Sequence, residues 1–281
     1  MKKHVSKPDW LKIRLGDTPL YAHTSSLLES HGLHTICVSG KCPNQGECWS
    51  RGTATFMIAG DICTRACKFC NTRTGRPLPL DVTEGQRIAQ TVSELALRYV
   101  VLTSVDRDDL SDYGARHWVS VINQIKTLNP DVKIEALIPD FKGKMHLIDL
   151  VTATSATVVA HNLETVERLT PEVRSVASYS TSLQVIERIA ANGKIAKSGM
   201  MVGLGESDAE VFQAMKDLRR VGCEVLTIGQ YLQPTRKHYA VNEYVNPEKF
   251  NEYKEAALSL GFRWVESGPL VRSSYHAENT F

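Results

Sequence analysis

The sequence predicts an α/β fold, a partial (β/α)6 barrel with an N-terminal extension and a C-terminal segment. Short apolar runs rich in β-branched residues alternate with longer stretches of helical periodicity, a pattern typical of parallel strands joined by right-handed crossovers. Six such units fall short of the eight in a closed barrel, so a partial barrel fits the count better. A doubly wound open sheet is the alternative.

The first 50 residues carry little periodicity and are punctuated by glycine and proline, so we expect an irregular extension that wraps onto the main body. The predicted strands then follow in order: 54–59, 99–103, 133–138, 157–160, 195–202 and 225–230. The predicted helices between them are 83–98, 115–128, 145–152, 180–192 and 207–221. A further helix over 247–260 begins near Pro247 and ends before Gly261.

This reading divides the chain into three parts: the extension at 1–50, the barrel at 51–245, and a final helix and segment at 246–281. The length of 281 residues suits one large domain with such extensions. A net charge of +2 opposes a nucleic-acid-binding module, and no apolar run reaches membrane-spanning length. The first ten residues do not form a secretory signal, so a cytoplasmic setting is expected.

Six of the seven cysteines form two sets of three. One set is Cys37, Cys42 and Cys48, and the other is Cys63, Cys67 and Cys70. Without a secretory signal, metal ligands are favoured over disulfides. Thiolates suit iron–sulfur clusters or zinc, and zinc would need a fourth ligand, for which His4, His23, His31 and His34 are the candidates. Cys223 stands alone and is expected to be a small buried hydrophobe.

Polar residues follow every predicted strand. In barrels of this kind, function gathers where strands end and loops begin, so a shared pocket is expected there. The polar groups after the first four strands are Asp61 with the second cysteine set, Asp106 to Asp109, Asp140, and His161 to Glu164. The last two strands end in Gly203-Leu-Gly205-Glu206 and in Gln230 to Pro234. Each alone also fits a helix cap or a plain turn.

Cys63-x-x-x-Cys67-x-x-Cys70, on the loop after the first strand, resembles the signature of the radical S-adenosylmethionine superfamily. The resemblance implies a [4Fe–4S] cluster with one open iron that binds S-adenosylmethionine. One electron then cleaves the sulfonium, and the resulting 5′-deoxyadenosyl radical abstracts hydrogen from a C–H bond.

The spacing Cys37-x4-Cys42-x5-Cys48 is similar to the auxiliary-cluster motif of one family in that superfamily, the lipoyl synthases. Three further stretches match the same family: 103–109, 229–234 and 272–277. The resemblance runs from about Trp10 to Ala277. It implies that two sulfur atoms are inserted at carbons 6 and 8 of an octanoyl group, with two S-adenosylmethionine molecules used per product. The auxiliary [4Fe–4S] cluster would be the sulfur donor.

The same resemblance makes Ser274 the fourth ligand of the auxiliary cluster, and Arg272 would steady that serine or the cluster's charge. An alkoxide is a hard ligand beside three thiolates, so we hypothesise that it marks the iron that leaves. Seven residues are expected to contact S-adenosylmethionine or the cluster: Asn162, Glu164, Arg174, Gly203, Gly205, Glu206 and Phe69. An apolar tunnel for the octanoyl chain is expected between the two clusters.

The expected substrate partners are octanoylated lipoyl carrier domains, of the H protein or 2-oxoacid dehydrogenase E2 type. The electron donor would be a ferredoxin or a flavodoxin, and a cluster-rebuilding carrier would restore the auxiliary cluster. No nucleic acid or membrane is expected as a partner. Another sulfur-inserting radical S-adenosylmethionine enzyme is the alternative function, and a non-enzymatic zinc or nucleic-acid-binding module is the third.

Overall fold

The computed structural model describes residues 7–13, 18–174 and 176–280. His4, one of the candidate zinc ligands, lies outside these ranges. Seven parallel strands form one sheet in the order β1-β4-β5-β6-β7-β8-β9. Their bounds are Thr55–Ile58, Tyr99–Ser104, Lys133–Leu137, Val158–Ala160, Ile195–Val202, Val225–Gln230 and Trp264–Gly268. In the described residues no pairing joins β1 to β9, so the barrel is open.

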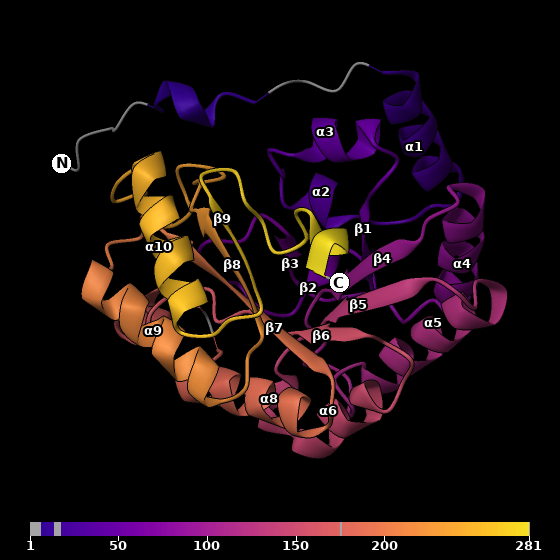
Figure 1. Ribbon diagram of the computed structural model, residues 1–281. Helices are drawn as coiled ribbons and strands as arrows, with labels where there is room; N and C mark the ends of the chain where they lie inside the picture. The colour runs from indigo at the N-terminus through magenta and orange to yellow at the C-terminus, as the bar shows by residue number, and fades with distance from the viewer. Residues whose placement is uncertain (1–6, 14–17, 175, 281) are drawn as a thin grey trace.

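Helices cover the outer face of this sheet, and Figure 1 shows them as an arc around the strands. They are α4 (Glu84–Glu94), α5 (Ala115–Leu128), α6 (Met145–Thr152), α8 (Tyr179–Ala191), α9 (Asp208–Arg220) and α10 (Pro247–Ser259), while the one-turn helix α7 (Thr170–Val173) lies in the loop after β6. Each large helix presents a buried apolar stripe, which in α5 includes Trp118, Val121 and Ile125. The strand residues that point outward, such as Phe56 and Leu102, are fully buried against this layer.

The inner face of the sheet forms the lumen of the partial barrel. Residues two apart along a strand share a face, and in-register partners on parallel strands do so too. Met57, Thr103, Leu137 and Lys197 therefore point into the lumen from four strands. The carboxyl ends of the strands meet at one end of this lumen. Residues that are distant in sequence can come together there.

The predicted strands and outer helices are present, and two expectations for the chain ends are wrong. The extension contains a helix α1 (Pro19–Ser30), where an irregular segment was expected. Thr18 caps this helix by accepting from the Tyr21 amide, and Pro19 fits its first turn. A seventh strand, β9, follows α10. Its residues Glu266 and Ser267 are polar, so the segment lacks the apolar run that marks the other strands.

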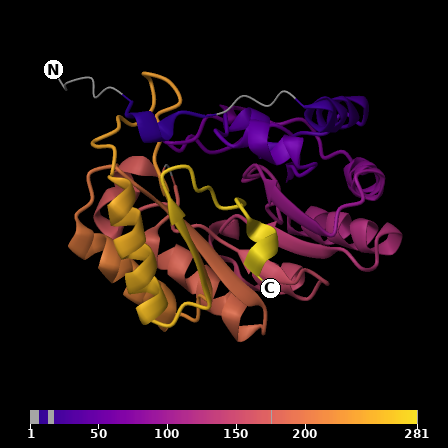
Figure 2. The ribbon, with the colours of Figure 1, turned by 45° about the horizontal axis from the view of Figure 1, so that its top comes forward.

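The extension and the end of the chain lie close to each other at the open side of the barrel (Figures 1 and 2). Two short helices, α2 (Ile36–Ser39) and α3 (Gln45–Ser50), carry Cys37 and Cys48, and Cys42 lies on the turn between them. Thr35 bridges to Phe56 of β1. Asn44 donates a hydrogen bond to the Leu270 carbonyl at 2.7 Å across 226 positions of sequence. The two chain ends therefore build one region together.

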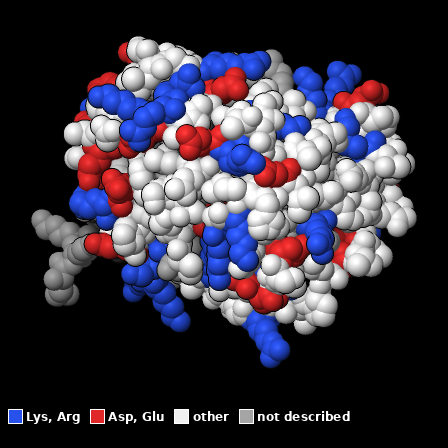
Figure 3. Space-filling view, turned by 90° about the horizontal axis from the view of Figure 1, so that it is seen from below, with Lys and Arg blue, Asp and Glu red and all other residues white. Residues whose placement is uncertain are grey.

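None of the helices in the described ranges is long and apolar enough to cross a bilayer. On the face that Figure 3 shows, Lys and Arg are interspersed with Asp and Glu. A pair of this kind joins α6 and α8, where Arg188 Nε lies 2.6 Å from an Asp149 oxygen. This face presents no continuous basic surface of the kind that binds a nucleic-acid backbone.

Candidate active site

The second cysteine set lies on the loop after β1. Cys63 belongs to β2 (Ile62–Cys63), which pairs with β3 (Arg73–Thr74), while Cys67 and Cys70 lie between these two short strands. Backbone amides of Arg65 and Asp106 point at Cys63 Sγ from 3.4 and 3.3 Å. Hydrogen bonds of this kind to cysteine sulfur tune an iron–sulfur cluster.

Two segments distant in sequence, at Val173 and at 238–239, form hydrogen bonds to this loop. The Lys68 amide donates to the Val173 carbonyl at 2.9 Å, and the Tyr239 amide donates to the Lys68 carbonyl at 2.8 Å. His238 Nε2 lies 3.0 Å from the Cys70 carbonyl oxygen. The loop is therefore fixed by its neighbours on several sides.

The three thiols of this set line a cavity of about 490 Å³ at the mouth of the barrel. Sites for small molecules usually span about 300–1,000 Å³, so this volume admits an extended ligand. Met57, Leu137 and Met201 add apolar surface from three strands. The apolar passage expected from the sequence therefore has a counterpart in this cavity.

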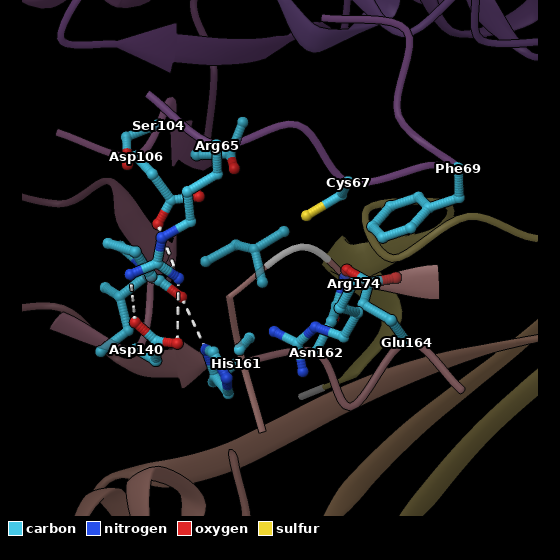
Figure 4. A pocket seen from close by; sticks show the side chains of 15 residues that line it. Arg65, Cys67, Phe69, Ser104, Asp106, Asp140, His161, Asn162, Glu164 and Arg174 are labelled. Atoms are coloured by element: carbon cyan, nitrogen blue, oxygen red, sulfur yellow. Dashed lines mark hydrogen bonds and ion pairs between the residues drawn. The ribbon is translucent and has the colours of Figure 1, made fainter. Parts of the chain in front are cut away.

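Arg65, inside the cysteine loop, is buried beside Asp106 and Asp140, which Figure 4 labels, and beside Asp108. Its guanidinium donates to both oxygens of Asp108, each at 2.9 Å, and to both oxygens of Asp140 at 2.7 and 3.0 Å. An oxygen of Asp106 lies 3.4 Å from Nη1. The aspartates follow β4 and β5, so Arg65 ties the cysteine loop to the ends of both strands.

The charges in this group act on one another. Burial raises the pKa of Asp140, but the hydrogen bonds and charge of Arg65 outweigh it and hold that pKa at about 2. Burial raises the pKa of Asp106 to about 6, although the Arg65 charge opposes the rise. Burial lowers the pKa of Arg65, but the hydrogen bonds that its guanidinium donates to Asp108 and Asp140 outweigh burial and raise that pKa. The guanidinium therefore stays charged and the Asp140 carboxyl stays ionised.

Sequence reasoning missed Arg65 altogether. The usable signal was an arginine between two cysteines, together with aspartates after two neighbouring strands. The acidic stretch from Asp106 to Asp109 was expected to border a shared pocket or to form a plain turn. Asp109 instead forms a bidentate pair with Arg107, with both distances at 2.9 Å.

A smaller cavity of about 130 Å³ adjoins the cysteine loop, and Figure 4 shows its lining. Phe69, Asn162, Glu164 and Arg174 all border it, so four of the predicted cofactor contacts lie together. The side-chain oxygen of Asn162 is buried without a hydrogen-bond partner. A buried polar atom without a partner is costly, so this one is available to a ligand.

Glu164 and Arg174 lie on the same side of that cavity (Figure 4). Burial raises the pKa of Glu164, while the Arg174 charge and a hydrogen bond from Asn162 act to lower it. Arg174 donates to Ser182 Oγ at 2.7 Å. Its guanidinium has further N–H groups that can meet a carboxylate.

His161 lies at the base of the same cavity. One ring nitrogen is 3.0 Å from the Ile138 carbonyl oxygen and the other is 3.1 Å from Ser182 Oγ. Burial, with help from the Arg174 charge, lowers the pKa of His161 to about 4. The imidazole is therefore neutral near pH 7.

Three predicted contacts lie elsewhere. Gly203, Gly205 and Glu206 form the turn after β7, and none of them lines either cavity beside the second cysteine set. The Glu206 carboxylate accepts hydrogen bonds from the amides of Gly203 and Leu204, the second at 3.0 Å. This carboxylate therefore holds its own turn, and its role toward a cofactor stays a prediction.

A second large cavity, of about 360 Å³, contains the first cysteine set. Cys37, Cys42 and Cys48 line it together with Arg272 and Ser274 from the far end of the chain. Thr55 donates a hydrogen bond to Ser274 Oγ at 2.9 Å. The structure therefore brings the predicted serine to the three cysteines, even though it lies more than 200 positions away.

A glycine lets the C-terminal segment reach this position. A side-chain carbon at Gly229 of β8 would lie 2.1 Å from the Val271 carbonyl oxygen, well inside contact distance. Only a residue without Cβ permits this approach. The segment therefore crosses the lumen against β8. In this way it places both Arg272 and Ser274 at the cavity of the first cysteine set.

Arg272 borders both large cavities. Burial lowers the pKa of its guanidinium, and the nearby Cys42 opposes that change. A half-buried cation beside a set of thiols suits a group that carries negative charge. The side chain lies where the two sites meet.

The thiols of the described ranges are not grouped as a site for a single metal ion. No three His, Cys, Asp or Glu side chains of the described ranges are grouped closely enough to hold one metal ion. A bridged cluster spaces its ligands more widely than a tetrahedral zinc ion does. Burial raises the pKa of Cys48 and of Cys63 to about 12, so a metal must displace their protons on binding. Cys223 is fully buried away from both sets, as expected.

Comparison with known proteins places this arrangement in context. Residues 57–229 match the model of the radical SAM superfamily. A protein of Bacteroides fragilis (strain YCH46) named lipoyl synthase is 60% identical over 276 residues, which cover 98% of this chain and 96% of that protein. A lipoyl synthase of Treponema denticola is 58% identical over 97% of this chain and 94% of its own length.

Solved structures share the fold at low identity. The crystal structure of Streptococcus suis SuiB bound to S-adenosylmethionine has a TM-score of 0.56 and 10% identity. The match covers 77% of this chain and 51% of SuiB. At that identity the likeness concerns the fold alone.

Proposed function

Because the chain belongs to the lipoyl synthase family of the radical SAM superfamily, we propose that its two cysteine sets hold two [4Fe–4S] clusters with separate tasks. The activity is that of the family: a radical SAM sulfurtransferase that converts an octanoyl group on a lipoyl carrier protein into the lipoyl group. The cofactors are S-adenosylmethionine and two [4Fe–4S] clusters. The proposal concerns which residues perform each part.

Cys63, Cys67 and Cys70 would hold the cluster that meets S-adenosylmethionine, and Cys37, Cys42, Cys48 and Ser274 would hold the auxiliary cluster. When bound, the first supplies an electron for cleavage of S-adenosylmethionine, and the second supplies the sulfur. One observation carries this assignment: four ligands drawn from both ends of the chain line one cavity, and three others line a second cavity.

The small cavity beside the cysteine loop would receive part of S-adenosylmethionine. The unpartnered oxygen of Asn162 can accept from an amino or hydroxyl group, and Arg174 can donate to a carboxylate. Phe69 would cover one side and keep water out. Neutral His161 holds Ser182, which in turn accepts from Arg174 and so orients that guanidinium.

Arg272 would act between the two sites. Its half-buried positive charge would offset the negative charge of a thiolate-ligated cluster two residues before Ser274. The octanoyl chain would lie in the larger cavity, with Met57, Leu137 and Met201 against its methylenes. Burial there is worth about 0.8 kcal/mol per methylene.

Several finer assignments belong to the same proposal. The carrier would be an H protein or a 2-oxoacid dehydrogenase E2 domain, and the electron donor a ferredoxin or flavodoxin. A cluster-rebuilding carrier would restore the auxiliary cluster, in a cytoplasmic setting. The segments 1–50, 51–245 and 246–281 would be the auxiliary-site extension, the radical SAM barrel and the closing segment.

The test is anaerobic reconstitution with iron and sulfide, followed by turnover of an octanoyl-lysine peptide with S-adenosylmethionine and a reductant. We expect about eight irons per chain, together with 5′-deoxyadenosine and a peptide that carries two sulfurs. Replacing Cys37, Cys42 and Cys48 by alanine should abolish sulfur insertion while 5′-deoxyadenosine still forms. Wild-type enzyme that forms 5′-deoxyadenosine but never adds sulfur would contradict the assignment.

A further inference from the structure

Three polar side chains meet inside the barrel, below the large cavity. Lys197 Nζ lies 2.7 and 2.9 Å from the two carboxylate oxygens of Glu135, and the Tyr99 hydroxyl donates to the same carboxylate at 2.8 Å. Glu135 and Lys197 are each 1% exposed. They come from β5 and β7, while Tyr99 begins β4, so the group spans the lumen.

The position of this group follows from strand alternation. Leu137 of β5 and Gly199 of β7 line the large cavity. Glu135 and Lys197 lie two residues earlier on the same strands, so they point to the same face roughly 6.6 Å deeper in the lumen. Tyr99 also borders the auxiliary cavity. The ion pair therefore lies beneath the large cavity and beside the auxiliary one.

Stability does not account for such a pair. Replacing a buried ion pair by apolar residues of similar volume is often neutral or stabilising, whereas removing one partner is strongly destabilising. The outward faces of the same strands carry apolar residues, as at Ile134 and Ala196. Apolar residues could thus have filled the lumen at this depth. The presence of a charged pair there needs a reason other than stability.

The reaction supplies a reason. Sulfur must reach carbons 6 and 8 of the acyl chain, and carbon 8 is the terminal methyl. An alkyl chain between apolar walls such as Met57, Leu137 and Met201 meets little resistance to sliding along its length. Its depth must therefore be fixed at one end, or the wrong carbons would face the reactive groups.

We infer that Glu135, Lys197 and Tyr99 form the floor that stops the acyl chain and sets its length at eight carbons. A longer chain would have to part a buried ion pair and leave its charges without partners. This inference rests on the proposed placement of the octanoyl chain in the large cavity. It assigns a specificity-determining role to residues that belong to neither cysteine set.

The first test uses the wild-type reconstituted enzyme with S-adenosylmethionine and no reductant, so that the chain is bound but not consumed. Dissociation constants are measured for hexanoyl-, octanoyl- and decanoyl-lysine peptides. From hexanoyl to octanoyl we expect about tenfold tighter binding, since two methylenes are added to an apolar site. From octanoyl to decanoyl we expect no gain. A further tenfold gain at decanoyl would overturn the floor.

The second test deepens the lumen. In the Glu135→Ala/Lys197→Ala variant both charges and their volume are removed, and decanoyl should bind about tenfold more tightly than octanoyl. The Glu135→Gln/Lys197→Met variant keeps the volume but removes the ion pair, so decanoyl should bind more tightly than octanoyl there too, by less than in the alanine variant. A folded alanine variant that still prefers octanoyl would overturn the inference, as would an unchanged wild-type preference in the Gln/Met variant.

Failure of the proposed function and failure of the floor would give different results. Thermal melting establishes which variants are folded, and the wild-type binding series decides the question if the alanine variant does not fold. Failure to convert octanoyl peptide with a reductant present would contradict the proposed function. A wrong chain-length profile with normal octanoyl conversion would contradict the floor alone.

Discussion

Arg65 shows how one residue can organise a cofactor loop. Its guanidinium is nearly inaccessible and donates to two carboxylates in a bidentate manner while a third lies at 3.4 Å. The planar fork of arginine matches this geometry, and the point charge of lysine does not. The position of the cysteine loop therefore depends on the shape of this side chain as well as on its charge.

Arg65→Lys should lower the free energy of unfolding of the cluster-free protein by about 3–5 kcal/mol, because buried carboxylates lose partners. Urea unfolding measures this change. Arg188→Lys is the matched control, since its bidentate pair with Asp149 is exposed and should contribute under about 1 kcal/mol. Equal losses in the two variants would show that burial of the Arg65 group is unimportant.

Ser274 and Ser273 are neighbours that line different cavities. Ser274→Ala should reduce lipoyl product about 10- to 100-fold, because the auxiliary site loses a ligand, while 5′-deoxyadenosine formation continues. Ser273→Ala serves as the control and should leave iron content at the auxiliary site unchanged. Mass spectrometry of the peptide and iron analysis give both readouts. Full product from Ser274→Ala would remove the serine from the ligand set.

His161 gives a pH prediction. Its pKa in the folded protein is about 4, below the ordinary 6.5, so the unfolded chain binds a proton that the folded protein does not. Stability from this residue is complete above pH 6.5 and is lost as the pH falls toward 4, by about 3 kcal/mol. Urea unfolding of the cluster-free protein across this range measures the slope. His161→Gln should flatten it, and an unchanged slope would assign the effect to other groups.

At the scale of single elements, β8 and the C-terminal segment depend on each other. Gly229→Ala would force the Val271 carbonyl away from β8 and shift Ser274 with it. We expect a loss of about 1–3 kcal/mol in stability from overpacking, together with lost iron at the auxiliary site. Gly268→Ala is the control, since its added carbon would meet only a Val271 methyl at 3.3 Å. Iron analysis and thermal melting distinguish the two.

The elements also show what sequence reasoning can reach. The six predicted strands carry apolar runs, which indicate burial directly. The spacing of the cysteines likewise indicates which three belong to each set. β9 was missed because Glu266 and Ser267 interrupt its apolar pattern, and α1 was missed because little periodicity marks the extension. The Arg65 group depends on three strand ends meeting in space. Local sequence patterns do not indicate which strand ends lie next to one another in the fold.

At the scale of the whole molecule, the extension and the C-terminal segment hold each other across the open barrel. Arg51, directly after the extension, lies 3.1 Å from a His276 nitrogen and 3.6 Å from a Glu278 oxygen. The Tyr275 hydroxyl donates to Glu47 at 3.3 Å. These contacts are partly exposed, so each is weak and the set acts together.

Loosening this set should mobilise the segment while the barrel is unaffected. In the Glu47→Gln/Arg51→Met variant, amide hydrogen exchange over 270–280 should become several-fold faster, since a few weak pairs are lost. Exchange in β5 and β7 should stay as in the wild type. Arg188→Met, which removes an exposed pair on the outer helices, is the control. Unchanged exchange over 270–280 would show that the lumen contacts alone retain the segment.

The hydrogen bond between Thr55 and Ser274 joins the first barrel strand to a residue made 219 positions later. Domains generally fold from the N-terminus during synthesis, so the barrel strands leave the ribosome well before this serine does. The cysteines of the first set are then present for a long interval without their fourth partner. Maturation of the auxiliary site is therefore deferred until translation has passed Ser274. A chain that stops before Ser274 would fold its barrel but could not complete the auxiliary site.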